Sequence, residues 1–236
     1  MRRLPIAAML MLASTSHGGR PLTSDDAASA ERGSCQLEVW LEQQPEFQQA
    51  VLAPACGLAD GLEFGLTWAR GRERTAAEPL SVDMASWAIK WLPVRSPWTT
   101  AAGTLVLGLK FSGDYQRLGT SGWQLQGYGV LGLATLELNQ DWTLHLNAGP
   151  WRDKASRGQA SLLNLALVWR PMPSSLVFVE WLGSDRPGLL GAHVRSAGMR
   201  WWLHSDKLGL DLSASRQAGV SGTSWTMGLG WYGIGF

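Results

Sequence analysis

From residue 35 to residue 236, large apolar residues repeatedly alternate with small or polar ones at a period of two. In the segment 160–170, for example, Leu163 and Leu165 fall on one side of an extended chain and Asn164 falls on the other. Successive side chains of a strand point to opposite faces, so the alternation predicts strands with one apolar and one mixed polar face. We predict twelve strands, at 35–43, 48–56, 62–71, 80–92, 99–111, 122–137, 141–151, 160–170, 175–183, 190–204, 208–217 and 225–236.

The lengths of these strands and of their connections narrow the fold class. Most strands have at least nine residues, longer than the usual strand of a soluble sheet and close to the length of about 9–11 residues that a tilted transmembrane strand needs. The connections alternate between short turns and longer segments that are rich in Gly, Ser and charge. The short turns are 58–61, 93–97, 139–141, 171–174 and 205–207, and the longer segments are 72–79, 112–121, 152–159, 184–189 and 218–224. This alternation is typical of barrels that span a membrane.

Tryptophan is the outlier of the composition, with 14 Trp beside 5 Phe and 3 Tyr. Trp suits a bilayer interface because its ring is apolar while its N–H seeks water or headgroups. Several stand near the ends of predicted strands, among them Trp91, Trp142, Trp169, Trp201 and Trp225. The favoured fold class is therefore all-β, a transmembrane antiparallel up-and-down β-barrel of twelve strands. Trp residues packed in the core of a soluble sheet are the alternative.

The first 34 residues have a different character. Arg2 and Arg3 precede a short apolar stretch, 4–13, and small residues follow it, which predicts a signal peptide over residues 1–18. The apolar stretch is too short for a transmembrane helix, and no later run of 18 apolar residues exists. Residues 19–34 are polar and rich in Ser and Ala, so we predict a flexible periplasmic segment there, followed by the barrel over residues 35–236.

The export signal, the amphipathic strands and the aromatic last strand, Trp225–Phe236, together resemble the outer-membrane β-barrel proteins of Gram-negative bacteria. The resemblance covers residues 35–236. It implies a monomer in the cell outer membrane that is surrounded by outer-membrane lipid and lipopolysaccharide. It also implies that the barrel assembly machinery recognises the last strand, through Tyr232, Ile234 and Phe236.

The two cysteines bracket the first predicted hairpin. If its turn is centred between Pro45 and Glu46, antiparallel pairing places Cys35 opposite Cys56. Directly opposed residues are close enough for a disulfide, and an exported chain meets an oxidising compartment. We therefore predict a Cys35–Cys56 disulfide at the periplasmic rim, where the barrel closes on its last strand.

Polar and charged residues on the mixed face are expected to point into the barrel, because a charge facing lipid costs several kcal/mol near the midplane. These lumen candidates are Glu38, Glu42, Glu63, Lys90, Lys110, His145, Asn147, Glu180, Arg200 and Asp211. They would either fill a narrow lumen with ion pairs or line a pathway that selects solutes. Twelve strands lie between filled barrels and open porins, and with no plug domain predicted we expect a narrow or partly blocked lumen.

The sequence offers little catalytic chemistry. His145, His193 and His204 are scattered over two predicted strands, and the three-residue offset between His193 and Ser196 places their side chains on opposite faces. No His or Cys set supplies the ligands of a metal site, so we expect no metal, no cofactor and no enzymatic activity. The net charge of +1 gives no reason to expect a nucleic-acid partner.

The predicted outer loops carry a modest excess of basic residues. Contacts with lipopolysaccharide phosphates are one interpretation and solvated ion pairs are the other; the candidate contacts are Arg70, Arg72, Arg74, Arg152, Lys154 and Arg157. The leading functional hypothesis is an outer-membrane barrel that acts as a narrow passive channel or a structural component. The alternatives are an exported soluble β-barrel that binds an apolar ligand and a membrane-embedded lipid hydrolase.

Overall fold

The computed structural model of the chain describes residues 22–45, 47–73, 81–93, 97–154, 157–186 and 193–236. Thirteen strands lie within these ranges: β1 (Ser34–Gln43), β2 (Phe47–Ala59), β3 (Leu62–Glu73), β4 (Ser81–Trp91), β5 (Trp98–Thr100), β6 (Gly103–Leu118), β7 (Gln124–Glu137), β8 (Trp142–Asp153), β9 (Gln159–Met172), β10 (Ser175–Ser184), β11 (Val194–His204), β12 (Leu208–Gln217) and β13 (Ser224–Gly235). Within the same ranges, no helix has the length and apolar composition that crossing a membrane requires.

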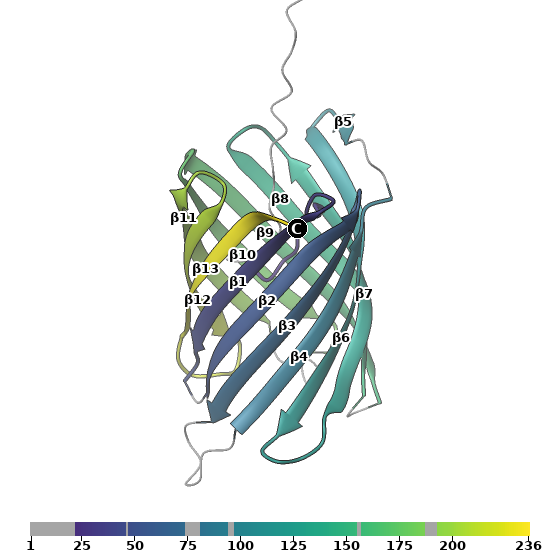
Figure 1. Cartoon of the computed structure of the whole chain (residues 1–236), viewed down its shortest axis with the longest axis vertical. Coiled ribbons are helices and arrows are strands. Elements are labelled where there is room, and N and C mark those ends of the chain that lie inside the picture. The colour runs from purple at the N-terminus through teal and green to yellow at the C-terminus, as the bar shows by residue number, and fades with distance from the viewer. Residues whose placement is uncertain (1–21, 46, 74–80, 94–96, 155–156, 187–192) are drawn as a thin grey trace, which may run out of the picture.

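The strands close into one barrel (Figure 1). Consecutive strands pair antiparallel, β4 pairs with β6, and β13 returns to pair with β1. The short strand β5 pairs only with the beginning of β6, so the other twelve of the thirteen strands form the wall. The predicted all-β, twelve-stranded antiparallel barrel is confirmed.

Side chains alternate between the outer and inner faces of the wall. On β10, Val177 and Val179 are exposed outside, Val179 by 55%, whereas Phe178 and Glu180 are buried inside. Outward positions of the other wall strands likewise expose Leu, Trp, Met and Val. Closure gives the main chain of the wall its hydrogen-bond partners, which is the condition under which hydrocarbon accepts a β structure.

The largest difference from the predicted strand boundaries lies in β6. The predicted strand 99–111 is observed as β6, which starts at Gly103 and continues to Leu118. Its second half is rich in Ser, Gly and Asp, which favour turns, but this half pairs with β4 from Leu118↔Val82 onward. Strand pairing therefore overrides the local preference. At its start, β6 forms a small hairpin with β5 through a turn in which Gly103 has φ +139°, a conformation that side chains other than that of glycine rarely adopt.

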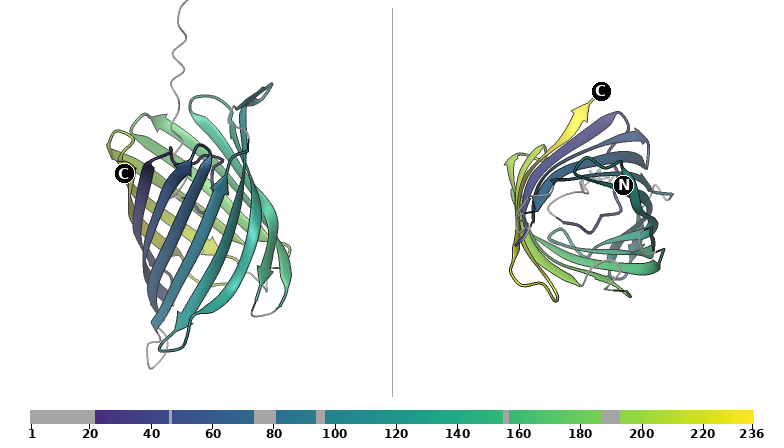
Figure 2. Two further views of the ribbon diagram at one scale, coloured as in Figure 1. Left: turned by 45° about the vertical axis from the view of Figure 1, so that its right-hand side comes forward. Right: turned by 90° about the horizontal axis from the view of Figure 1, so that it is seen from below.

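The prediction of a flexible N-terminal segment is wrong for its described part. Residues 22–33, here called the lumen segment, lie inside the ring of strands (Figure 2, right). Ser24, Asp26 and Ala27 are buried there. The polar composition indicated disorder, but the barrel interior supplies partners for these polar groups. The predicted signal peptide, 1–18, falls outside the described residues.

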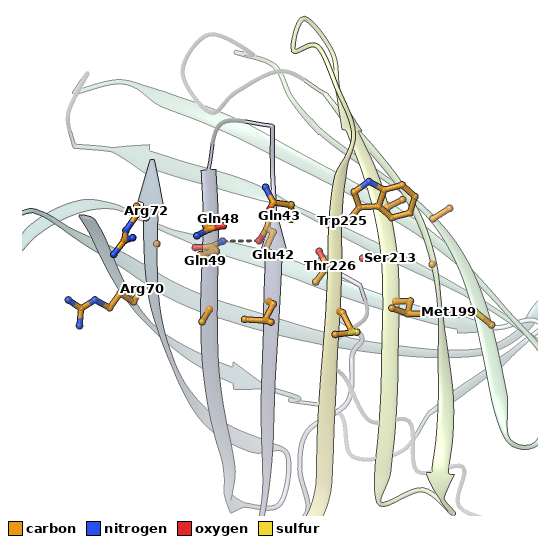
Figure 3. Close-up of a pocket in the computed structure, with 18 of the residues that line it drawn as sticks. Glu42, Gln43, Gln48, Gln49, Arg70, Arg72, Met199, Ser213, Trp225 and Thr226 are labelled. Carbon is orange, nitrogen blue, oxygen red and sulfur yellow. Dashed lines mark hydrogen bonds between the residues drawn. The ribbon is translucent and has the colours of Figure 1, made fainter. Parts of the chain in front are cut away.

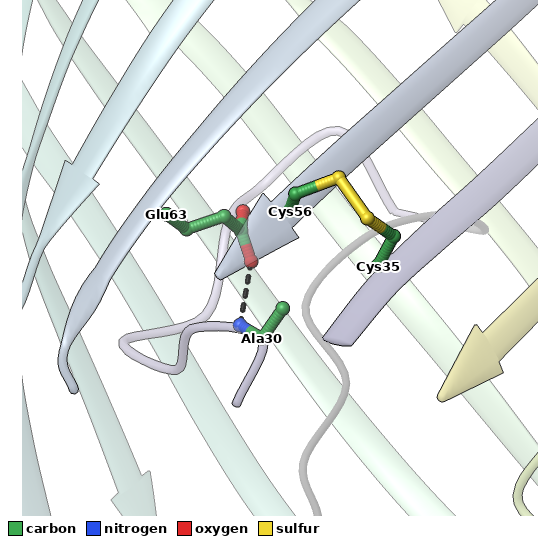
Figure 4. Close-up of a disulfide and its surroundings, with 4 residues drawn as sticks. All are labelled: Ala30, Cys35, Cys56 and Glu63. Atoms are coloured by element: carbon green, nitrogen blue, oxygen red, sulfur yellow. Dashed lines mark hydrogen bonds between the residues drawn. A yellow bond between two sulfur atoms is a disulfide. The ribbon is translucent and has the colours of Figure 1, made fainter. Parts of the chain in front are cut away.

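The predicted disulfide is present and joins Cys35 of β1 to Cys56 of β2 (Figure 4). The two residues are register partners in the hairpin, and their Cα atoms lie 4.0 Å apart. Cys35 also faces Ile234 of β13, so the bond stands at the seam where the barrel closes. At the same end, the N–H of Ala30 in the lumen segment donates to Glu63 (Figure 4). The disulfide therefore fixes the hairpin next to both the seam and the lumen segment.

We expect the Cys35→Ser/Cys56→Ser variant to lower the free energy of unfolding by about 2–4 kcal/mol, because a cross-link restricts the unfolded chain. The measurement is urea unfolding in detergent, in which the folded fraction is determined from the difference in gel mobility between the folded and the unfolded barrel. Intact mass before and after reduction and alkylation provides the control for bond formation. Equal unfolding midpoints of the variant and the unreduced native protein would show that the bond does not stabilise the barrel.

Candidate functional site: the occupied lumen

The lumen segment is bonded to the wall through its main chain. The N–H groups of Thr23, Asp25, Ala27 and Ala30 donate, in that order, to Glu180, Asn147, Thr135 and Glu63, at 2.9, 2.8, 2.8 and 2.7 Å. These acceptors lie on β10, β8, β7 and β3, so the segment winds around the inside of the barrel from strand to strand. It reaches β2 at Gly33, whose N–H donates to the carbonyl of Gly57 at 3.0 Å.

Ion pairs add to these bonds at the centre of the segment. The Nζ atom of Lys90 on β4 lies 3.3 Å from a carboxylate oxygen of Asp25 and 3.3 Å from one of Asp26. Lys110 on β6 binds the second oxygen of Asp25. Asn147 donates its side-chain amide back to the carbonyl of Asp25 at 2.8 Å. Asp25 is thus held from three sides, which makes it the main polar anchor of the lumen segment.

The two carboxyl groups of the segment respond to burial in opposite ways. Burial raises the pKa of Asp25, but the Lys110 and Lys90 ammonium groups outweigh it and lower that pKa from 3.8 to about 2. For Asp26, burial raises the pKa above 3.8 although Lys90 opposes the shift. A lowered pKa in the bound segment means that the attraction of Asp25 is present above pH 3.8 and is lost as the pH falls toward 2.

An apolar contact completes the attachment of the segment. Leu22 packs against a buried cluster on the inner face, formed by Val168 of β9 and by Leu176 and Phe178 of β10. Burying a leucine side chain contributes about 1.5–3 kcal/mol relative to exposure. The segment is therefore held by an apolar contact near its start, ion pairs at its centre and main-chain bonds along its length.

A second polar cluster lies on the inner face near the seam. Arg200 of β11 is 1% exposed and binds Asp211 of β12 through two hydrogen bonds of 2.7 Å. Glu38 of β1 lies 3.8 Å from Arg200 and accepts a hydrogen bond of 2.6 Å from the hydroxyl of Tyr232 on β13. The Tyr232 ring faces the guanidinium at 4.9 Å. Glycine at 230 makes room for this ring, since a Cβ there would come within 2.4 Å of the Tyr232 hydroxyl.

The structure places all ten lumen candidates on the inner face of the wall. It brings nine of them into two groups, one around the lumen segment and one around Arg200. His145 lies in the first group, with Nδ1 3.0 Å from the hydroxyl of Thr135. Glu42 stands apart, nearer the loop end, where it accepts hydrogen bonds of 2.8 Å from Gln44 and Gln49.

Sequence reasoning missed the inner partners of these residues. The sequence pattern places Asp25 and Asp26 in a flexible segment and does not single out Thr135. The adjacent carboxylates of Asp25 and Asp26 were the available signal, since the predicted wall already carried two inward lysines without assigned partners. The remaining space between the segment and β1–β6 is a cavity of about 330 Å³, lined in part by Glu38, Glu63 and Lys90.

The three residues predicted to be recognised during assembly, Tyr232, Ile234 and Phe236, differ in their burial. Tyr232 is buried in the lumen, in step with the inward Gly228 and Gly230, and an extra residue in β13 near Gly233 then shifts the register with β1. Ile234 is half-buried opposite Cys35. Phe236 is 78% exposed, and its N–H donates to the carbonyl of Gly33 at 3.1 Å. Their recognition by the barrel assembly machinery stays a prediction.

The basic loop candidates lie outside the lumen where they are described. Arg70 and Arg72 are exposed on the outer face of β3. Arg152, Lys154 and Arg157 are exposed around the end of β8. The Lys154 ammonium group lies 5.4 Å from the ring of Tyr128. The remaining candidate, Arg74, falls outside the described residues.

Catalytic and metal-binding groups do not gather at any described place. No group of three or more His, Cys, Asp and Glu residues with metal-binding geometry occurs in the described part of the chain. His145 faces the lumen beneath the segment, and the ring of His193 stacks on Trp181 at 5.3 Å. Neither contact pairs a histidine with a serine hydroxyl.

A closed antiparallel wall with an apolar outside and a polar lumen is the architecture of a transmembrane β-barrel. The chain belongs to the family described as "Uncharacterised conserved protein UCP029691", whose profile matches residues 6–230. No sequence match was found among the curated proteins.

Solved barrels of the same fold include two porins and an enzyme. The KdgM porin has a TM-score of 0.60 at 8% identity, covering 83% of this chain and 98% of the porin. The NanC porin has a TM-score of 0.56 at 8% identity, with coverage of 84% and 98%. Outer membrane phospholipase A from Escherichia coli has a TM-score of 0.51 at 9% identity, with coverage of 93% and 95%. At these identities, the similarity establishes a shared fold.

The cluster around Arg200 predicts a large stability effect. We expect Arg200→Met to lower the free energy of unfolding by about 3–5 kcal/mol, because it leaves Asp211 buried without its partner. Arg200→Met/Asp211→Leu should recover part of this loss. The measurement is urea unfolding in detergent, with Arg195→Met on the exposed face of the same strand as the control, expected within about 0.5 kcal/mol of the native protein. An Arg200→Met barrel as stable as the control would contradict this account of the cluster.

Proposed function

We propose that the protein is a narrow passive channel of the outer membrane whose lumen is closed by its own lumen segment. The observation that carries the proposal is the position of residues 22–33, which wind around the inside of the barrel and cover its inward charges. Small solutes pass when the segment leaves. The barrel acts as a monomer, since one chain completes the wall.

The bonds that hold the segment are suited to reversible closure. Its only backbone bridge of β type among the described residues joins Arg32 to Gly57, at the end of the segment. The other polar contacts are hydrogen bonds and ion pairs, each of which water can replace at a net cost of about 0.5–3 kcal/mol. The segment can therefore detach without breaking the ladders of the wall.

Similarity to known porins supports a channel over a purely structural barrel. KdgM and NanC are named as porins, and one KdgM structure was solved in complex with disordered oligogalacturonate. In this chain, departure of the segment would expose Lys90 and Lys110, which now bind Asp25 and Asp26, to a passing solute. Glu63 and Glu180 would also be exposed, so the open pathway presents charges of both signs. Such a lumen does not suit the apolar ligand of the soluble alternative.

We also propose that the protein is not an enzyme. Outer membrane phospholipase A shares the fold, which alone carries no activity. A lipid hydrolase needs an activated hydroxyl within reach of lipid. The histidine–hydroxyl pair of the described residues, His145 with Thr135, is buried in the lumen, where lipid has no access.

The Asp25→Asn/Asp26→Asn variant tests whether the lumen segment closes the channel. Without the two carboxylates, Lys90 and Lys110 no longer form ion pairs with the lumen segment, and the segment leaves the lumen more easily. We therefore expect channel openings in planar bilayers to become at least about tenfold more frequent than in the native protein. Asp206→Asn, in an exposed turn at the short-turn end of the barrel, is the matched control and should behave as native. Opening frequencies that are equal in the variant and the control would contradict the proposal.

A cross-link in the same background makes the test independent of stability. A Cβ at residue 108 would lie 3.8 Å from the Cβ of Ala27, a separation typical of disulfides, so Ala27→Cys/Gly108→Cys should lock the segment to β6. We expect the locked channel to stay closed until dithiothreitol is added, while the unlocked variant with the same reductant conducts throughout. Conduction through the oxidised, locked form would show that the segment is not the gate. A barrel that stays silent even after deletion of residues 22–32 would overturn the channel itself.

A further inference from the structure

A groove of about 1010 Å³ runs along the wall of the barrel, across the strands on both sides of the closing seam (Figure 3). It is lined by strands on both sides of the β1–β13 junction, from β3 and β4 to β10. No residue of the lumen segment lines it. The groove is therefore separate from the lumen cavity.

The strand register shows that the groove opens outward. Each of the six central strands contributes three consecutive residues, of which the flanking two face outside and the middle one faces inside. On β1, for example, Leu41 is 59% exposed and Glu42 points inward to Gln49. The outer strands contribute outward positions, such as Val177 of β10. Residues with outward side chains thus make up most of the lining of the groove.

The floor of the groove is a row of apolar side chains, here called the apolar row, that runs from strand to strand, perpendicular to the strands. Register partners place six residues side by side along this row: Ala50, Leu41, Met227, Leu212, Met199 and Val177. The small side chain of Ala50 and the flexible methionines leave a surface that fits acyl chains better than a flat wall does. A second row, one step nearer the loops, includes Gln43 and Trp225, residues suited to the headgroup level.

One end of the groove is positively charged. Arg70 continues the apolar row beyond Ala50, and Arg72 continues the second row. Arg70 has a side chain that is 67% exposed and lies 3.7 Å from Asp83, which Arg117 also binds. Arg72 forms no ion pair with another described residue. Three arginines and one aspartate, Asp83, leave a net positive charge at the loop end of an apolar surface, where an anion would complete the arrangement.

We propose that this groove binds lipopolysaccharide, with a lipid A phosphate at Arg70 and Arg72 and the acyl chains along the apolar row. The loop end of an outer-membrane barrel faces the outer leaflet, so the phosphates and acyl chains of this lipid lie at the depths of the arginines and the row. A second copy of the chain is disfavoured as the occupant, because a symmetric contact would place arginines of both copies in one interface. The site does not depend on whether the lumen conducts.

The test compares two variants that each remove two positive charges from the outer loop end. Binding of lipid A to the purified, detergent-solubilised protein is followed by native mass spectrometry. We expect Arg70→Gln/Arg72→Gln to weaken binding at least about tenfold. Arg152 and Lys154 are also candidate contacts by sequence, but they lie on the outside of β8 and do not line the groove, so Arg152→Gln/Lys154→Gln should leave binding unchanged. The gel mobility shift on heating verifies that each variant is folded.

Three further arms test the chemistry of the site. Dephosphorylated lipid A should bind the native protein as weakly as bisphosphorylated lipid A binds the arginine variant, and inorganic phosphate should not compete. Ala50→Trp fills the floor beside Arg70 and should weaken lipid A binding while keeping both arginines. Equal losses in both charge variants, equal binding of phosphatidylethanolamine, or dimer formation in place of lipid A binding would each overturn the proposal.

Discussion

The whole structure depends on the pairing of β13 with β1. Without it, two strands would carry unpaired N–H and C=O groups into hydrocarbon, where each unsatisfied group costs several kcal/mol. Closure also allows the outer face to expose Leu41, Met227 and Trp231 without aggregation. The disulfide between Cys35 and Cys56 lies beside this junction and ties the first hairpin to its register.

Closure creates an interior that must also be satisfied. A ring of this size encloses more space than its inward side chains fill, and those side chains include charges that cannot face lipid. The lumen segment occupies this space and supplies partners for Lys90, Lys110, Glu63 and Glu180. Near the seam, the buried charges of Arg200 and Asp211 bind each other, so the wall itself supplies their partners. The interior is thus divided into a part occupied by the lumen segment and a part filled by side chains of the wall.

The outer surface shows the same division between apolar and charged regions. Apolar positions dominate the middle of the wall, whereas Arg70, Arg72 and Arg117 stand at its loop end. Arginine there can reach water or phosphate, so its cost falls from that of a midplane charge to nearly nothing. Asp83 between two of these arginines keeps them at the surface of the wall.

The barrel, its twelve wall strands and the pairing of Cys35 with Cys56 could all be predicted from the sequence. A side-chain period of two and a short hairpin are local properties, and local properties can be read along a chain. Three features became visible only in the folded chain: residues 22–33 lie inside the barrel, Tyr232 contacts the Arg200 cluster in the lumen, and 112–118 continues a strand. Each of these depends on partners distant in sequence, such as Asn147 for Asp25 and Glu38 for Tyr232, which meet only after the ring has closed.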